Sequence, residues 1–274
     1  MNRFFVKYCC VNLKGGMRKT NQDNFFVQNR YRKSNEPDID LIYSGKFCSA
    51  DNEIIAVYDG MGGEACGGIA SLIAASETIK YNNNNDSGEF LLRNLCNYLN
   101  FQVCGYAQKN NISCMGTTAA IMKFENSQIF ICNLGDSRIY RIRQGSIKQI
   151  SKDHILEGFT MGKPPLTQFL GMPVNEAEIE PYIATGKYVS GDRYLLCSDG
   201  ITDMLSDDDI LKIVFNAEDV NSGAKELVSQ ALQNGGIDNI TAILCEIEGN
   251  NLFQNIAEKI NSKLNSKKKS KEMK

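Results

Sequence analysis

The sequence predicts an α+β fold: two packed antiparallel β-sheets flanked by helices, which form a four-layer αββα sandwich. Short apolar runs separated by turn residues recur along the chain and are typical of strands. Two separated pairs of amphipathic segments are typical of helices, and such helices must cover the faces of a sheet. The length of 274 residues, with 42% hydrophobic residues, suffices for one large core.

The predicted strands occur in three groups along the chain. The first group ends in a nearly continuous apolar run, which is typical of a buried strand. The second group is expected to form an antiparallel meander, because only short turns separate its members. Residues 29–47 are polar and are expected to form a loop or a ragged hairpin. The predicted strands are 4–13, 24–28 and 53–58, then 117–124, 128–133, 137–143 and 146–150, and finally 193–197 and 239–247.

The first predicted helix pair lies between residues 69 and 103, with apolar residues at helical spacing. The second pair begins at Ser206, which is expected to cap a helix with Asp209 as its capping-box partner. Its last helix, 221–233, is followed by Gly235 and Gly236, which favour a helix end.

We expect one domain over residues 1–250, because no internal repeat or linker separates parts of the chain. Residues 152–170 contain Gly and Pro without a clear period, and long irregular segments of this kind are often functional. Residues 251–274 are rich in Lys and Ser and are expected to form a C-terminal helix or a frayed basic tail.

The composition excludes several classes of protein. A net charge of −2 argues against a nucleic-acid partner. No apolar stretch is long enough for a membrane span, and the first residues lack the pattern of a signal peptide. The ten cysteines are scattered without a CxxC pair, which is typical of reduced thiols in a cytoplasmic protein. Nothing indicates an obligate interface, and we expect a monomer.

Five aspartates stand at the ends of predicted strands, beside small residues or Asn. They are Asp59 in AVYDG, Asp136 in NLGDSR, Asp199 in LLCSDG, Asp238 in GGIDNI and Asp23 in TNQD. Each alone is ordinary turn chemistry. If the strand ends converge, however, the carboxylates would repel one another unless a cation lies between them. Hard oxygen ligands favour Mg²⁺ or Mn²⁺.

A pair of such ions can activate a shared water and bind both oxygens of a phosphoryl transfer. Asp59 suits a bridging position, because Gly60 after it leaves room for its backbone carbonyl to bind an ion. Arg18 shares a short segment with Asp23 and is a candidate for binding phosphate through two N–H groups. The alternative interpretation of Arg18 is an ordinary surface arginine.

An ordered set of motifs resembles the metal-dependent Ser/Thr protein phosphatases, the PPM or type 2C family. The motifs extend from Arg18 to about Ile247, nearly the whole chain except the tail. The DGMGG form is similar to bacterial members, because eukaryotic members usually carry His where Met61 stands. The matching stretches are RKTNQD, VYDGMGG, MGTTAA, NLGDSRIY, SKDH, LTQFLG, GDRYLLCSDGITDML and GIDNITAI.

The resemblance implies a central β-sandwich with a site for two Mn²⁺ or Mg²⁺ ions at one end. By this resemblance Asp59 bridges both ions, and the Gly60 carbonyl binds one of them. Asp199 and Asp238 complete the two coordination shells, one on each ion.

Further positions match the family outside these shells. Asp23 matches a residue that holds metal-bound waters, and Asp136, alone or with Asp199, matches a third, weaker metal site. Arg18 matches the phosphate-binding arginine. Residues 152–170 match the flap that borders the site and influences the choice of substrate; here it is short and contains Pro164-Pro165.

The proton donor for the leaving group is left open by the sequence. Met61 cannot donate a proton, so either a metal-bound water does so or the demand is small. His154, in the SKDH motif, is expected to have a structural or surface role rather than a catalytic one.

The implied function is hydrolysis of phosphoserine and phosphothreonine on proteins by a hydroxide that bridges two ions. The implied partners are phosphorylated proteins and a cognate Ser/Thr kinase. The alternative is an inactive member that binds phosphopeptides or acts as a scaffold. An intact set of Asp59, Asp199 and Asp238 favours the active enzyme. A calcium-binding structural domain is disfavoured, because its loop motif is missing.

Overall fold

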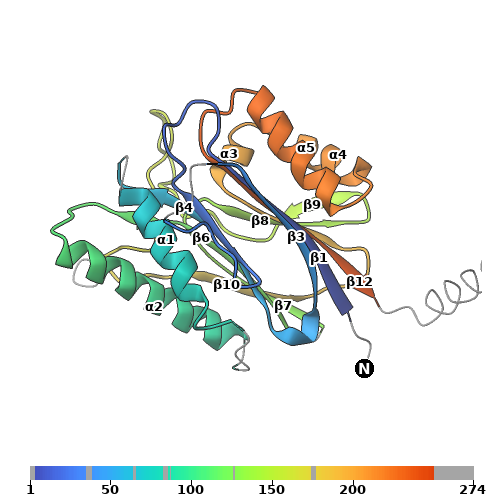
Figure 1. Cartoon of the computed structure of the whole chain (residues 1–274), viewed down its shortest axis with the longest axis horizontal. Helices are drawn as coiled ribbons and strands as arrows, with labels where there is room; N and C mark the ends of the chain where they lie inside the picture. Colours follow the sequence, from blue (N-terminus) through green and yellow to red (C-terminus); the bar gives the residue numbers. More distant parts are fainter. Residues whose placement is uncertain are drawn as a thin grey trace, which may run out of the picture.

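The computed structural model describes residues 4–34, 39–63, 66–82, 86, 88–125, 127–173 and 177–249. Two antiparallel sheets pack face to face and helices cover their outer faces, so the predicted four-layer αββα sandwich is confirmed (Figure 1). The predicted C-terminal helix or basic tail, 251–274, lies outside the described residues.

The two sheets are built entirely from antiparallel strand pairs. The first sheet has the order β3 (Leu41–Cys48), β1 (Phe4–Leu13), β12 (Ile240–Gly249), β11 (Arg193–Cys197), β8 (Arg138–Arg143) and β9 (Ser146–Gln149). The second has the order β10 (Tyr182–Lys187), β7 (Gln128–Leu134), β6 (Ala119–Glu125), β4 (Ile54–Met61) and β2 (Asp23–Val27), and β5 (Gly116–Thr117) pairs with β4.

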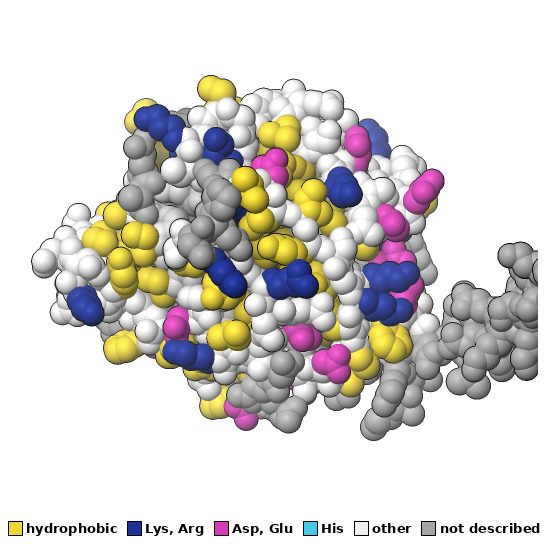
Figure 2. Space-filling model, viewed as in Figure 1, with side chains coloured by type: hydrophobic (Ala, Val, Ile, Leu, Met, Phe, Trp, Pro, Cys, Tyr) yellow, Lys and Arg dark blue, Asp and Glu magenta, His cyan; other side chains and the backbone are white. Residues whose placement is uncertain are grey.

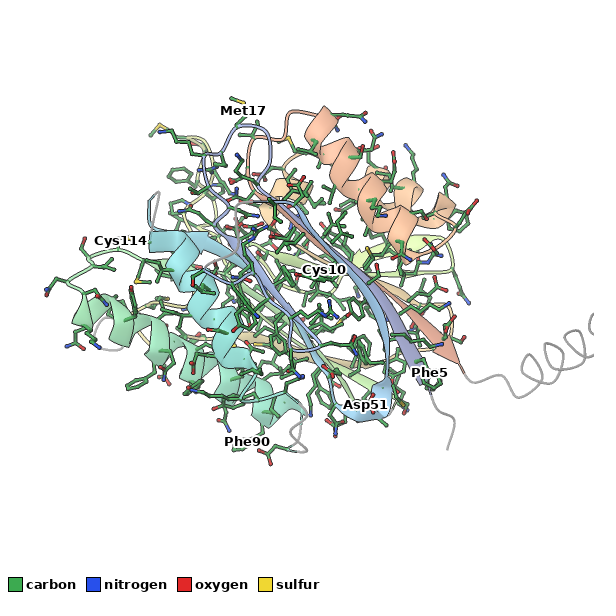
Figure 3. The ribbon with its side chains drawn as sticks, in the orientation of Figure 1. Phe5, Cys10, Met17, Asp51, Phe90 and Cys114 are labelled. Atoms are coloured by element: carbon green, nitrogen blue, oxygen red, sulfur yellow. The ribbon has the colours of Figure 1, made fainter. Side chains whose placement is uncertain are left out.

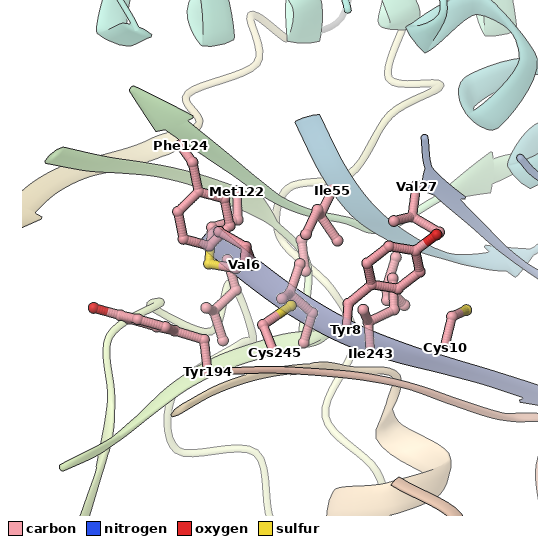
Figure 4. Packing of buried hydrophobic residues seen from close by; sticks show 14 of the residues in the cluster. Val6, Tyr8, Cys10, Val27, Ile55, Met122, Phe124, Tyr194, Ile243 and Cys245 are labelled. Atoms are coloured by element: carbon pink, nitrogen blue, oxygen red, sulfur yellow. The ribbon is translucent and has the colours of Figure 1, made fainter. Parts of the chain in front are cut away.

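The central core lies between the two sheets. Strand β1 directs Val6, Tyr8 and Cys10 into this core, where they meet side chains such as Ile55 and Phe124 of the opposite sheet (Figure 4). The alternate residues of β1 point to the other face and pack under the helices. Because both faces are buried, β1 has a nearly continuous apolar sequence rather than an alternating one.

Helices form the two outer layers (Figure 1). On the second sheet lie α1 (Cys66–Thr78) and α2 (Gly88–Lys109), whose buried residues share a core cluster with β4, β6 and β7. On the first sheet lie α3 (Asp199–Thr202), α4 (Asp207–Asn216) and α5 (Val220–Gln233). The predicted cap of α4 is confirmed, because Ser206 accepts a hydrogen bond from the backbone N–H of Asp209. A single 3₁₀ turn, Ser49–Asp51, follows β3.

The predicted meander over residues 117–150 is wrong in its topology. Strands β6 and β7 join the second sheet, whereas β8 and β9 join the first. The chain crosses between sheets at Gly135, whose φ of +91° is a left-handed conformation that favours glycine. Asp136 therefore lies where the two sheets meet. Strand β10 was not predicted, because 182–187 had no assignment, and β3 lies in the segment 29–47 that was expected to form a loop or a ragged hairpin.

The charged surface and the thiols are distributed as follows. On the face shown in Figure 2, basic and acidic side chains are interspersed rather than gathered by sign. All ten cysteines are free, including Cys10 in the core and the exposed Cys114 (Figure 3). In the described part of the chain, no helix is long and apolar enough to cross a membrane.

Candidate metal centre

A cavity of about 640 Å³ lies at one end of the sandwich. At this end β4, β7 and β11 finish while β2 and β12 begin, and the five predicted aspartates lie at or next to these strand ends. The loop between β1 and β2 forms one wall, with the exposed Met17 at its tip (Figure 3). The predicted residues that line the cavity are Arg18, Asp59, Gly60, Asp136, Asp199 and Asp238.

Asp59 is held rigidly near the end of β4. Its carbonyl accepts hydrogen bonds from the Thr118 N–H at 2.8 Å and the Thr117 hydroxyl at 2.9 Å, and its own N–H donates to the Thr118 hydroxyl at 3.0 Å. A Cβ atom on Gly60 would lie 2.2 Å from the carbonyl oxygen of Gly67. Only glycine therefore lets the start of α1 pack against the strand beside Asp59.

Asp23 lies behind the cavity wall and is 2% exposed. Its carboxylate accepts hydrogen bonds from the Ser198 hydroxyl at 2.7 Å and the Thr241 hydroxyl at 2.6 Å. Burial raises the pKa of Asp23 to about 6, although these two hydrogen bonds oppose the shift and Asp238 adds to it. Asp23 is thus tied to Ser198, directly before Asp199, and to Thr241 on β12, close to Asp238.

Asp199 is the first residue of α3 and follows β11 directly. Its Oδ1 atom is buried and has no hydrogen-bond partner, a state that proteins usually avoid. A Cβ atom on Gly200 would lie 2.0 Å from the carbonyl oxygen of Asn239, so glycine permits this helix to approach the start of β12. Asp199 and Asp238 are brought to the same cavity by this close approach.

Arg18 reaches Asp238 across the mouth of the cavity. Its NH2 group lies 2.5 Å from Asp238 Oδ2, and this hydrogen bond is the main reason why the pKa of Arg18 is raised. The Arg18 side chain remains 49% exposed, so it is accessible to a ligand from solution.

Asn239 holds the loop that carries Arg18. Its side-chain oxygen accepts from the Gln22 N–H at 2.8 Å, and its amide donates to the carbonyls of Lys14 at 2.7 Å and Thr20 at 2.9 Å. One buried amide therefore fixes both ends of the loop. Asn239 is a positioning residue for Arg18.

The electrostatics of the cavity favour a bound cation. The pKa of Asp59 is raised well above its usual value, first by burial and then by the charges of Asp23, Asp136 and Asp238. Burial also raises the pKa of Asp136. The orphaned Asp199 Oδ1 atom and this oxygen-only donor set suit a hard divalent ion such as Mn²⁺ or Mg²⁺. In the described part of the chain, no group of three His, Cys, Asp or Glu side chains is already arranged closely enough to hold a metal ion.

Five further residues were not anticipated as parts of the site. Four of them adjoin predicted aspartates or lie within the quoted motifs, and this adjacency was the available signal. The fifth, Lys163, comes from the irregular segment 152–170 and lines the cavity. The other four are Thr118, Ser198, Asn239 and Thr241.

The two residues considered as proton donors occupy different places. Met61 lines the cavity and carries no proton to donate. His154 does not line it; its Nδ1 atom is buried without a partner, and burial lowers its pKa. Its backbone N–H donates to the Gly135 carbonyl at 3.0 Å, which suits the structural role expected for it.

A β-sandwich with clustered carboxylates and an arginine at one end is the architecture of metal-dependent phosphatases, as the sequence motifs implied. The chain belongs to the protein phosphatase 2C family, whose model matches residues 28–234.

Curated relatives carry the same kind of name. The chain is 28% identical over 229 residues to the serine/threonine protein phosphatase PstP of Mycobacterium tuberculosis, covering 79% of this chain and 43% of PstP. It is 30% identical over 244 residues to the serine/threonine phosphatase stp of Listeria welshimeri, covering 82% of this chain and 94% of that protein. Thus the chain spans less than half the length of the mycobacterial relative and nearly all of the listerial one.

Solved structures have the same fold. The crystal structure of M. tuberculosis PstP superimposes with a TM-score of 0.73 at 26% identity, covering 89% of this chain and 99% of that one. The catalytic domain of PstP in complex with two manganese ions gives a TM-score of 0.72 at 26% identity, with the same coverage.

Proposed function

We propose that this protein is a metal-dependent phosphatase that removes phosphate from phosphoserine and phosphothreonine in proteins. The observation that carries the proposal is the convergence of Asp59, Asp136, Asp199 and Asp238, from separate parts of the chain, in one cavity with Arg18. Its membership of the protein phosphatase 2C family and the names of its relatives support the reaction class.

The proposed cofactors are two Mn²⁺ or Mg²⁺ ions, and the two manganese ions of the PstP catalytic domain support this number. In this proposal Asp59 would bridge the ions, Asp199 and Asp238 would bind one each, and the Gly60 carbonyl would be a further ligand. Asp23 acts from behind the wall through water. When bound, such ions supply an activated water and neutralise charge on the phosphoryl group.

The chain's own residues would then bind and orient the phosphate. Arg18 donates to Asp238 in this structure. A cation bound to Asp238 would weaken its hydrogen bond to the guanidinium, whose N–H groups would then be available to phosphate oxygens. Asn239 keeps the loop in place, so Arg18 stays at the mouth of the cavity.

The leaving alkoxide takes its proton from water in this proposal. Met61 cannot donate one, and His154 lies outside the cavity lining. The cavity is open enough for water to reach the leaving group, because Arg18 and Lys163 at its mouth are each 49% exposed.

The proposed partners are phosphorylated proteins and a Ser/Thr kinase that acts on the same proteins. An exposed mouth allows a residue on a large substrate to enter. Residues 152–170 would act as the flap that meets the substrate, because Pro164 and Leu166 line the cavity. In this proposal residues 1–250 form one phosphatase domain that works as a monomer.

Hydrolysis of a phosphothreonine peptide tests the proposal. We expect turnover with Mn²⁺ or Mg²⁺ and its loss in a chelator, with circular dichroism confirming that the protein stays folded. Absence of turnover in folded protein that has bound the ions would reject the enzyme. Phosphopeptide binding in that same sample would instead support the inactive binding module.

A further inference from the structure

Lys163 projects from residues 152–170 into the carboxylate cavity. Its ammonium group forms ion pairs with Asp199, its closest contact, with Asp203 at 3.4 Å and with Asp136 at 3.5 Å. Asp136 and Asp199 line the cavity, whereas Asp203 stands at its rim and is half exposed. A lysine ammonium has three N–H donors, so it can serve three carboxylates at once.

The backbone around Lys163 is restrained. Gly162 before it has a φ of +91°, and Pro164 and Pro165 follow it. The proline rings fix their own φ angles and restrict the residue before them. The Leu156 N–H donates to the Pro165 carbonyl at 2.9 Å, which closes the segment into a hairpin-like loop. The restrained backbone of this loop therefore fixes the direction from which the Lys163 side chain enters the cavity.

Two positive side chains enter the cavity and pair with different carboxylates. Arg18 pairs with Asp238, and Lys163 pairs with Asp136 and Asp199. In the part of the chain that the structure describes, neither Asp59 nor Asp23 forms an ion pair. Asp59 and Asp23 are thus the two described carboxylates of the site that lack a paired cation.

We propose that the Lys163 ammonium takes the place of a third metal ion between Asp136 and Asp199, so that the protein binds two ions and not three. This inference rests on the proposed function, because it takes Asp59, Asp199 and Asp238 as the ligands of the two catalytic ions. A third divalent ion would have to displace a tethered cation that already contacts both carboxylates. In this proposal Asp136 forms an ion pair with Lys163 and does not bind a metal ion.

Removal of the charge opens the third position. Lys163→Met keeps a long side chain but leaves Asp136, Asp199 and Asp203 without their cation. Partly buried carboxylates without a partner favour a divalent ion. We expect two Mn²⁺ ions per wild-type chain and three per Lys163→Met chain, or at least a tenfold lower Kd for the third ion. Lys163→Arg retains the charge and is expected to bind two ions.

Titration with Mn²⁺ alone, followed by native mass spectrometry and calorimetry, counts the ions and measures their affinities. Lys152→Met is the matched control, because Lys152 belongs to the same segment, is exposed and does not line the cavity; it should bind two ions like the wild type. Equal numbers and affinities in wild type and Lys163→Met would overturn the proposal. So would a gain limited to the first two ions, since Lys163 would then oppose the catalytic ions. The count requires no turnover, so an inactive chain that binds ions as expected would refute the phosphatase but not this inference.

Discussion

Asp23 and Asp59 stand directly opposite one another in the β2–β4 strand pair. The charge of Asp23 raises the pKa of Asp59, whereas hydrogen bonding with Asp59 lowers the pKa of Asp23 against the larger effect of burial. Two ionised carboxylates on neighbouring strand ends, one of them buried, lower the stability of the folded state unless a cation binds between them. This relationship is the basis of the predictions that follow.

The free energy of unfolding of the metal-free protein should fall as the pH rises, because Asp23 ionises. The folded pKa of Asp23 is about 6 against 3.8 for the free group, so the folded state binds more protons between about pH 4 and pH 6. Its ionisation therefore costs about 3 kcal/mol of folding free energy above pH 6. Urea unfolding in a chelator should show Asp23→Asn gaining stability relative to wild type across this window. A difference that does not change with pH would contradict the assigned shift.

Loss of a proposed metal ligand should abolish turnover without unfolding the chain. Asp199→Asn and Asp238→Asn are each expected to lower kcat by more than the roughly 10–100-fold that loss of an outer ligand partner costs. Asp208→Asn on α4 is the control, because Asp208 is exposed and outside the cavity lining. Near-wild-type turnover in either ligand variant would show that the ligand assignment is wrong.

Arg18→Ala should mainly raise KM, because it removes phosphate binding that is common to the ground state and the transition state. Charge-assisted hydrogen bonds of about 1.5–3 kcal/mol correspond to a rise of roughly ten- to a hundredfold. Arg18→Lys keeps the charge but loses the paired N–H geometry, and should give an intermediate KM. Steady-state kinetics at saturating Mn²⁺ measures both variants, and an unchanged KM in Arg18→Ala would exclude the phosphate role.

Asn239→Ala should affect stability and phosphate binding together. The amide makes three hydrogen bonds to the backbone of Lys14, Thr20 and Gln22, so its loss is expected to cost about 3 kcal/mol. The freed loop should also raise KM, because Arg18 is no longer held at the cavity. Comparison of urea unfolding with kinetics separates the two effects; a destabilised variant with wild-type KM would show that Asn239 does not position Arg18.

The aspartates of the site could be predicted because their signal is local. Each adjoins a buried strand, and a strand end fixes the position of its neighbour in space. Asp59 and Asp199 illustrate this, since an apolar run ends just before each. Asn239 and Lys163 act through contacts with loops distant in sequence, and no local pattern reports such contacts.

Strand β10 was missed, and β3 was predicted only as part of a loop or a ragged hairpin, for a related physical reason. Each stands at the edge of its sheet and pairs on one side only. Their burial patterns contain many intermediate and exposed residues, so the apolar run that marks a central strand is missing. The division of the predicted meander between two sheets could not be predicted either. The sequence pattern of the turn at Gly135 is the same whether the next strand joins the same sheet or the other one.

Crystals grown in Mn²⁺, measured at the manganese absorption edge, test the central claim most directly. The account predicts two anomalous peaks in the cavity, both in contact with Asp59, one reached by Asp199 and the other by Asp238. Peaks outside the cavity, or within it but away from Asp59, would contradict the metal centre on which the proposed phosphatase activity depends.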